Sequence, residues 1–291
     1  MTVLDLPAPI AERERPEFWI VRTLAAKELR SALADRWLWL YGLAFAVLSA
    51  AIGSIAASDA QTVGFTGFGR SASSLVALVQ LVVPLMGLSA GARGLAGQRE
   101  RGTLTFLLSH PVSPTEVYLG VYLGNAAAMA AAVSGGFGIA GLVAVIQRTP
   151  IDGLDLVAIA ALAWLLAIAM IGVGLVVSVL SARSSTAMGV SLVLWLVFVM
   201  LGNLGLMGSS VATGMSDSAL FAAATANPTE AFRLASMSAL GGSLDVLGPV
   251  GTYAVDRFGD AVGWVTTAGL MVWVVVPVAL GAALFRRGPE R

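Results

Sequence analysis

The chain contains no cysteine, one histidine and few charged residues. Without cysteine it has no disulfides, thiolate metal sites or cysteine nucleophiles, and His110 cannot form a multi-histidine site by itself. We therefore predict no metal site in this chain. Charged residues make up 12% of the sequence, whereas soluble domains carry roughly 25%. With 57% hydrophobic residues, the composition indicates a polytopic membrane protein.

Sequence motifs for catalysis are missing as well. The only lysine, Lys27, lies in LAAKEL with no glycines before it, so the chain lacks the GxxxxGK[ST] loop that binds nucleotide phosphates. There is no HExxH motif and no obvious serine partner for His110. The formal net charge is zero, which gives no reason to expect nucleic acid as a partner. We therefore predict that the chain is not an enzyme, with no catalytic residues and no cofactor of its own.

Long apolar runs define the fold class. A bilayer core about 30 Å thick needs roughly 20 apolar residues per helix. That rule predicts an all-α membrane protein with six spans, at about 37–57, 72–92, 117–146, 154–180, 187–206 and 263–285. Four of the 17 basic residues, Arg70, Arg148, Arg233 and Arg257, fall on one side of these spans and the others on the opposite side. Because cytoplasmic segments carry the Lys/Arg excess, we expect both termini in the cytoplasm and the chain in the plasma (inner) membrane.

These spans divide the chain into a cytoplasmic region (1–36), a membrane domain (37–285) with an external segment at about 207–262, and a cytoplasmic tail (286–291). Within 17–36, the apolar residues near one helical face are Phe18, Val21, Ala25, Leu29 and Ala32. This pattern predicts an amphipathic helix in the membrane interface, or alternatively an ordinary solvated helix before the first span. In the external segment, Asn227, Pro228 and Glu230 fit an N-cap, a first-turn proline and a reciprocal carboxylate, which together predict a short helix.

Polar residues are sparse inside the predicted spans. No charged residue falls clearly within one, which argues against an ion-coupled secondary transporter, because such transporters normally use one. Gln80 and Asn125 are amides within spans. Each could line a transport pathway or form a hydrogen bond between helices.

A short polar segment between the second and third spans has a definite structural pattern. Residues 99–108 fit a short helix with Leu104, Leu107 and Leu108 on one face. Pro111 disfavours helical geometry at His110 and should end it. Ser113 and Glu116, with Pro114 between them, fit a capping box that begins the next helix. The leucine face would pack either on the protein's own helices or in a groove of a cytoplasmic partner; the residues leave both open.

The segment ERGTLTFLLSHPVS, at 100–113, resembles the stretch after the second span of ABC-2 type permeases, the membrane subunits of a class of ATP-binding-cassette transporters. The resemblance implies two copies of the permease and cytoplasmic ATPase subunits that bind ATP and Mg. It also implies an ATPase-coupling set drawn from this segment: Arg99, Glu100, Arg101, Gly102, Thr103, Leu104, Leu107 and Leu108.

Further short stretches are similar to one subgroup of that family, the permeases that serve maturation of nitrous-oxide reductase. They are GFTGF at 64–68, NPTEAFRL at 227–234 and FRR at 285–287. The subgroup implies an external β-helical copper-processing protein as a further partner. Two other functions stay open at this point: a membrane anchor or scaffold for an external assembly, and an ion-coupled secondary transporter.

Overall fold

A computed structural model describes residues 17–36, 39–40, 42–51, 67–146, 153–212, 216–241, 244 and 249–288. Regular structure in these ranges is helical. The elements are α1 (Phe18–Leu33), α3 (Gly67–Glu100), α4 (Thr103–Leu108), α5 (Pro114–Ile146), α6 (Gly153–Leu180), α7 (Ser184–Ala212), α8 (Asp217–Thr225), α9 (Pro228–Ala239), α10 (Pro249–Phe258), the 3-10 turn η3 (Gly259–Ala261) and α11 (Val262–Arg287).

Among the described residues, five helices are long and apolar enough to cross a membrane: α3, α5, α6, α7 and α11. They correspond to the second to sixth predicted spans. Of the first predicted span, 37–57, the described part includes an apolar helix at Gly42–Ala51 that is too short to cross by itself. Residues 52–57 lie outside the described residues, as do 1–16, most of GFTGF and 289–291. Six spans therefore remain a prediction.

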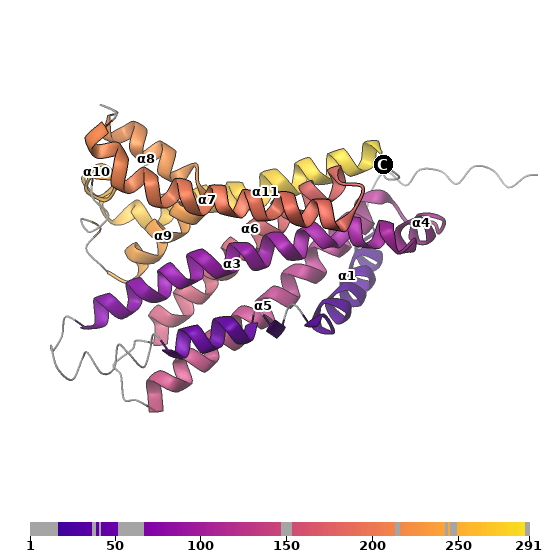
Figure 1. The fold of residues 1–291 in the computed structure, drawn as a ribbon, viewed down its shortest axis with the longest axis horizontal. Coiled ribbons are helices and arrows are strands. Elements are labelled where there is room, and N and C mark those ends of the chain that lie inside the picture. Colours follow the sequence, from indigo (N-terminus) through magenta and orange to yellow (C-terminus); the bar gives the residue numbers. More distant parts are fainter. Residues whose placement is uncertain are drawn as a thin grey trace, which may run out of the picture.

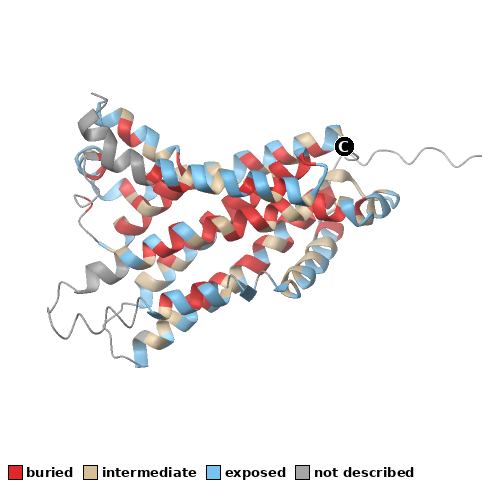
Figure 2. Ribbon diagram, in the orientation of Figure 1, coloured by how far each residue is buried: buried red, intermediate tan, exposed pale blue. Residues whose placement is uncertain are grey.

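The buried core is centred on α6, which packs against α3, α5 and α11 (Figure 2). Glycines bring the backbones of α3 and α6 together. A Cβ on Gly174 would lie 2.5 Å from the carbonyl oxygen of Leu88 and 3.1 Å from the Cα of Gly91. Small residues allow such close approach between membrane helices, so the contact between α3 and α6 depends on the absence of side chains at these two positions.

The molecule has two distinct ends. Figure 1 shows α4, α1 and the C-terminus at one end of the long helices, and α8, α9 and α10 at the other. In place of the single helix predicted for the external segment, the structure has three short helices there. They form with the start of α11 a second small core that includes Phe221, Leu234, Val250 and Val262. The residues of that core are spaced along separate short helices. They form no continuous apolar run of span length, so the sequence pattern does not predict them.

Helix α1 packs along the beginning of α5. A Cβ on Gly120 would lie 2.5 Å from the Cβ of Leu24, and one on Gly124 would lie 2.8 Å from the carbonyl oxygen of Ala25. Val21 is buried, as its place on the predicted apolar face requires. Phe18, on the same predicted face but at the first position of the helix, is by contrast 79% exposed, and Trp19 beside it is 65% exposed.

Candidate coupling site

The short helix after α3 is smaller than the predicted one. We predicted a helix over 99–108, but Arg99 and Glu100 belong to the last turn of α3, and α4 begins at Thr103. The cause is Gly102, whose φ of 71° places it in the left-handed region. Glycine adopts this conformation without steric cost. The break lets the chain change direction between α3 and α4.

The two faces of α4 have different environments. Leu104 is 2% exposed and belongs to the main core, and Leu108 is half-buried against it. Leu107 is also half-buried. The predicted leucine face therefore packs on the protein's own helices. Phe106, two positions from Leu104 and roughly 200° around the helix, is 65% exposed.

Phe106 is held in its exposed position by local contacts. Its ring lies edge to face with the imidazole of His110 at a centroid distance of 4.7 Å, and the Nδ1 of His110 is 2.9 Å from the Phe106 carbonyl oxygen. Phe106 was not among the predicted site residues, because the leucine spacing alone does not single it out. An aromatic residue opposite a leucine face, in a segment predicted to be cytoplasmic, was the available signal.

The predicted capping box is present. The backbone N–H of Ser113 donates to Glu116 Oε2 at 2.7 Å, and the backbone N–H of Glu116 donates to Ser113 Oγ at 3.2 Å. Pro114 is the first residue of α5. Helix α4 ends at Leu108, with Pro111 in the exposed connection that follows. The stop and the cap predicted from Pro111, Ser113 and Glu116 are thus confirmed as local structure.

Glu116 makes a second contact that the sequence does not reveal. Its Oε1 accepts a hydrogen bond from the backbone N–H of Glu17 at 2.7 Å, and the Glu116 side chain is fully buried. Glu17 directly precedes α1. One carboxylate therefore joins the beginning of α1 to the connection between α4 and α5.

Arg99 and Glu100 hold the turn between α6 and α7. The Arg99 guanidinium donates to the carbonyl oxygen of Ser181 at 2.7 Å, and Glu100 Oε1 accepts from the backbone N–H of Ser184 at 2.9 Å. Neither residue lies on α4, and both side chains are directed to this turn. Of the predicted coupling set, the structure places Thr103, Leu104, Leu107 and Leu108 on α4, with Arg101 and Gly102 at the break before it.

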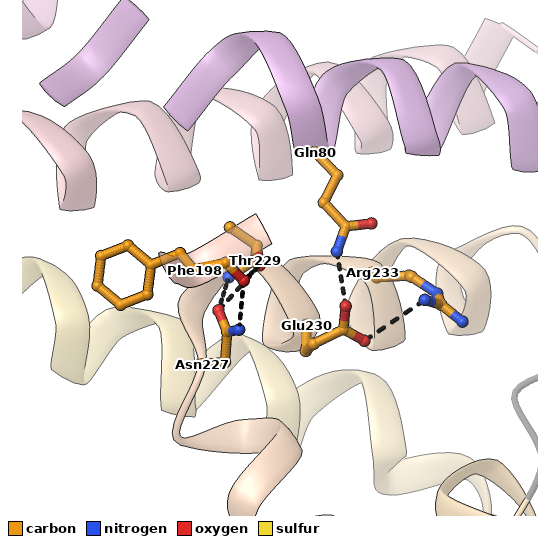
Figure 3. Close-up of polar contacts among 6 residues, drawn as sticks. All are labelled: Gln80, Phe198, Asn227, Thr229, Glu230 and Arg233. Carbon is orange, nitrogen blue, oxygen red and sulfur yellow. Dashed lines mark hydrogen bonds and ion pairs between the residues drawn. The ribbon is translucent and has the colours of Figure 1, made fainter. Parts of the chain in front are cut away.

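A polar cluster lies in the first half of α3, where α3 meets α9 (Figure 3). Gln80 Nε2 donates to Glu230 Oε1 at 2.7 Å, and Glu230 Oε2 lies 3.6 Å from the Arg233 guanidinium. Glu230 is 3% exposed. Burial raises the pKa of its carboxyl group, while Arg233 and the hydrogen bond from Gln80 act in the opposite direction. Gln80 is thus an interhelical polar residue, one of its two predicted roles.

The predicted role of Glu230 as a reciprocal helix cap is wrong. Its two oxygens bind Gln80 and Arg233 instead of the backbone before α9. The side chain turns toward α3 and α7 because α9 packs against both, and Gly202 on α7 leaves room for it: a Cβ there would lie 3.2 Å from the Glu230 carboxyl carbon.

Asn227 caps α9 as predicted. Its side-chain oxygen accepts from the backbone N–H of Thr229 at 3.0 Å. Its amide nitrogen also donates to the carbonyl oxygen of Phe198 on α7 at 2.8 Å. The NPTE sequence therefore anchors α9 to α7 through Asn227 and to α3 through Glu230, as Figure 3 shows.

Within the described part of the chain, Asn125 forms no hydrogen bond to another helix. Its Nδ2 donates to the carbonyl oxygen of Val121, one turn earlier in α5, at 2.8 Å. The residue is half-buried and lines a cavity. Among the described residues, no group of three or more His, Asp or Glu side chains is placed to hold a metal ion.

Long apolar helices with a short anchored helix between two of them define a polytopic membrane protein with a candidate docking element. The sequence profile of the family described as "ABC-2 family transporter protein" matches residues 22–288. The chain belongs to this family.

Two relatives are similar over nearly their whole length. "Probable ABC transporter permease protein NosY" of Stutzerimonas stutzeri is 31% identical over 278 residues, which cover 92% of this chain and 98% of the relative. The protein of the same name from Pseudomonas aeruginosa is 31% identical over 277 residues, covering 93% and 99%. Both are named as permeases, and the chain is of the NosY-like type of ABC-2 permease.

Proposed function

We propose that this chain receives ATP-driven motion through α4 from separate cytoplasmic ATPase subunits, which bind ATP and Mg. The observation that carries the proposal is the contrast between Leu104 and Phe106. Leu104 fixes α4 to the core, while Phe106 is held outward and has no apolar cover in the described structure. An exposed aromatic residue on a rigid base is the kind of anchor that protein interfaces use.

The contacts around α4 support transmission of force into the bundle. Helix α4 is joined covalently to α3 and α5, and Glu116 joins this connection to α1. Arg99 and Glu100 join the end of α3 to the turn between α6 and α7. A displacement of α4 would therefore act directly on α3 and α5, on α6 and α7 through the end of α3, and on α1 through Glu116.

The membrane arrangement is part of the same proposal. We infer six spans, a second copy of the permease, α1 in the membrane interface, and both termini in the cytoplasm of a plasma-membrane protein. The support is the Lys/Arg excess on one side of the spans and the location of α1, α4 and the C-terminus at one end of the molecule (Figure 1).

The proposed cellular role is maturation of the copper site of nitrous-oxide reductase, together with an external β-helical copper-processing protein. Its support is the similarity to the subgroup named above and to permeases called NosY. With no cysteine and one histidine in the chain, the copper chemistry in this proposal takes place on partner proteins.

Phe106→Asp tests the coupling role. We expect loss of ATPase co-purification and of permease-stimulated ATP turnover, because the substitution removes the apolar anchor while leaving the buried face of α4 intact. Val255→Asp is the matched control, an exposed apolar residue on α10 at the opposite end. If Phe106→Asp retains the ATPase at the wild-type level with unchanged turnover, α4 is not the coupling element.

A second variant distinguishes transport from scaffolding. In an assembly whose ATPase carries an inactivated phosphate-binding loop, the proposed function should be lost although the subunits still assemble. Function that persists without ATP hydrolysis would instead support an anchor or scaffold.

A further inference from the structure

A polar cavity of about 590 Å³ lies between α1, α3 and α5, at the same end of the molecule as α4. Two positive and two negative side chains line it. Its polar residues are Glu28, Ser31, Asp35, Arg93, Arg101 and Asn125. Apart from Met129, the remaining lining residues are alanine or glycine, which leaves the space open.

Three of the four charged residues already have partners. The Arg93 guanidinium pairs with Asp35 at 2.7 Å and also donates to the carbonyl oxygen of Ser89 at 3.3 Å. Glu28 pairs with Lys27 at 2.9 Å. The Arg101 guanidinium binds no acceptor within the described ranges. It is therefore the positive charge that the described lining leaves unneutralised.

The Arg101 side chain folds back over Gly97. A Cβ on Gly97 would lie 3.4 Å from one guanidinium nitrogen of Arg101 and 3.7 Å from the other. The guanidinium thus lies back along α3, one turn before its own Cα and on the side of Arg93. A larger residue at position 97 would displace it from the cavity.

The location fits a membrane headgroup. The candidate span in α3 ends at Glu100, so Arg101 follows it directly. Helix α1, which forms one wall, is too short to span, and its exposed Phe18 and Trp19 suit the boundary between lipid and water. Trp39, also exposed, follows shortly after α1.

We propose that this cavity binds the phosphoethanolamine headgroup of a membrane phospholipid. The Arg101 guanidinium would hold the phosphate, because its planar fork matches phosphate oxygens. Glu28, on the facing wall, would take the ammonium group in place of the exposed Lys27. Phosphoethanolamine carries one negative and one positive charge, which matches a lining of two cationic and two anionic side chains. The phosphoglycerol headgroup is anionic and would bring no positive group to the carboxylates. This inference does not depend on the ATPase role of α4.

Lipid retention by the full-length chain tests the proposal. The chain is reconstituted in nanodiscs of phosphatidylethanolamine and phosphatidylglycerol in equal amounts, transferred to detergent, and examined by native mass spectrometry. We expect retained phosphatidylethanolamine in excess over phosphatidylglycerol. Gly97→Leu, which displaces Arg101, should lower that retention at least fivefold. Gly135→Leu is the matched control, since a Cβ at Gly135 meets nothing within 4 Å.

Asn125→Leu provides a second variant that fills the cavity from α5 and leaves α3 unchanged, and it should lower retention in the same way. Soluble competitors separate the sources of phosphate: millimolar glycerophosphoethanolamine should compete weakly, and inorganic phosphate should not displace the lipid. Equal retention of the two lipids overturns the proposal, as do wild-type retention in both cavity variants and displacement by inorganic phosphate alone.

Discussion

The backbone N–H of Glu17 donates a hydrogen bond to Oε1 of Glu116, 99 residues later in the chain, at 2.7 Å. The other oxygen of the same carboxylate accepts from Ser113. A single buried side chain thus completes the cap of α5 and fixes the start of α1. The cap is local and visible in the sequence, whereas the tie to α1 arises only when α1 packs on the glycines of α5.

Glu116→Ala should destabilise the fold and weaken coupling. It leaves the N–H groups of Glu17 and Ser113 without their acceptor, and an unsatisfied buried group costs about 1–3 kcal/mol. The check is thermal unfolding of the purified permease together with ATP turnover of the assembled complex. Thr115→Ala, at the neighbouring half-buried position, should change neither by a comparable amount. Equal unfolding temperatures for the two variants would contradict this role of Glu116.

Gly102→Val should be more harmful than Gly102→Asn. The φ of 71° is strained for a β-branched residue, while asparagine tolerates the left-handed region. No atom lies within 4 Å of a Cβ at this position, so the cost is conformational, about 1–2 kcal/mol for valine. Unfolding temperatures of both variants measure it. Identical values would show that the break between α3 and α4 does not need a left-handed residue.

Glu230→Gln should alter the pH dependence of stability. Burial raises the pKa of the Glu230 carboxyl above its usual 4.5, so the unfolded chain releases this proton before the folded one does. The protein therefore loses stability as pH rises from 4.5 toward the raised pKa. Glutamine cannot ionise but can still accept from Gln80, so the stability of the variant relative to wild type should increase across that window.

Unfolding temperatures at a series of pH values from 4 upward test this expectation. Asp217→Asn removes an exposed carboxylate from α8 at the same end of the molecule and serves as the control. A constant difference between Glu230→Gln and wild type at every pH would refute the assignment.

Gly174→Ala should destabilise the contact between α3 and α6. The added methyl group would meet the carbonyl oxygen of Leu88 at 2.5 Å, so the backbones must separate. Such overpacking typically costs about 1–3 kcal/mol. Gly189→Ala in α7, where a Cβ meets nothing within 4 Å, should be neutral or stabilising, because alanine has the higher helix propensity. The unfolding temperature should therefore fall in Gly174→Ala and stay at or above the wild-type value in Gly189→Ala; an equal fall in both would contradict the role of Gly174.

Sequence patterns predicted those parts of the structure that depend on neighbours along the chain. Span-length apolar runs located five long helices, and the spacing of Ser113 and Glu116 located a capping box. The partner of Glu230 could not be found this way, because Gln80 and Glu230 are 150 residues apart and nothing in either segment specifies the other. The exposed position of Phe106 likewise depends on which face of α4 meets the core.

The three short helices α8, α9 and α10 were not all predicted, for a related reason. Each is too short to produce a long apolar run, and their shared core is assembled from residues of separate helices. The prediction of a helix from Arg99 to Leu108 failed at one residue, Gly102, whose conformation matters more than the apolar spacing around it. Gly102 follows two charged residues, Glu100 and Arg101, and precedes an apolar helical turn. A glycine in such a position indicates a possible break between two helices.

The continuity of α3 has a consequence for communication across the membrane. Gln80 binds Glu230 of α9, and Glu100, 20 residues later on α3, binds the turn between α6 and α7. These contacts are about 30 Å apart along the helix axis. Thermodynamic linkage is reciprocal. Suppose that nucleotide binding to the ATPase moves α9 through α3 and so changes the affinity of α9 for a partner protein. Binding of that partner to α9 must then change the nucleotide affinity of the ATPase by the same factor.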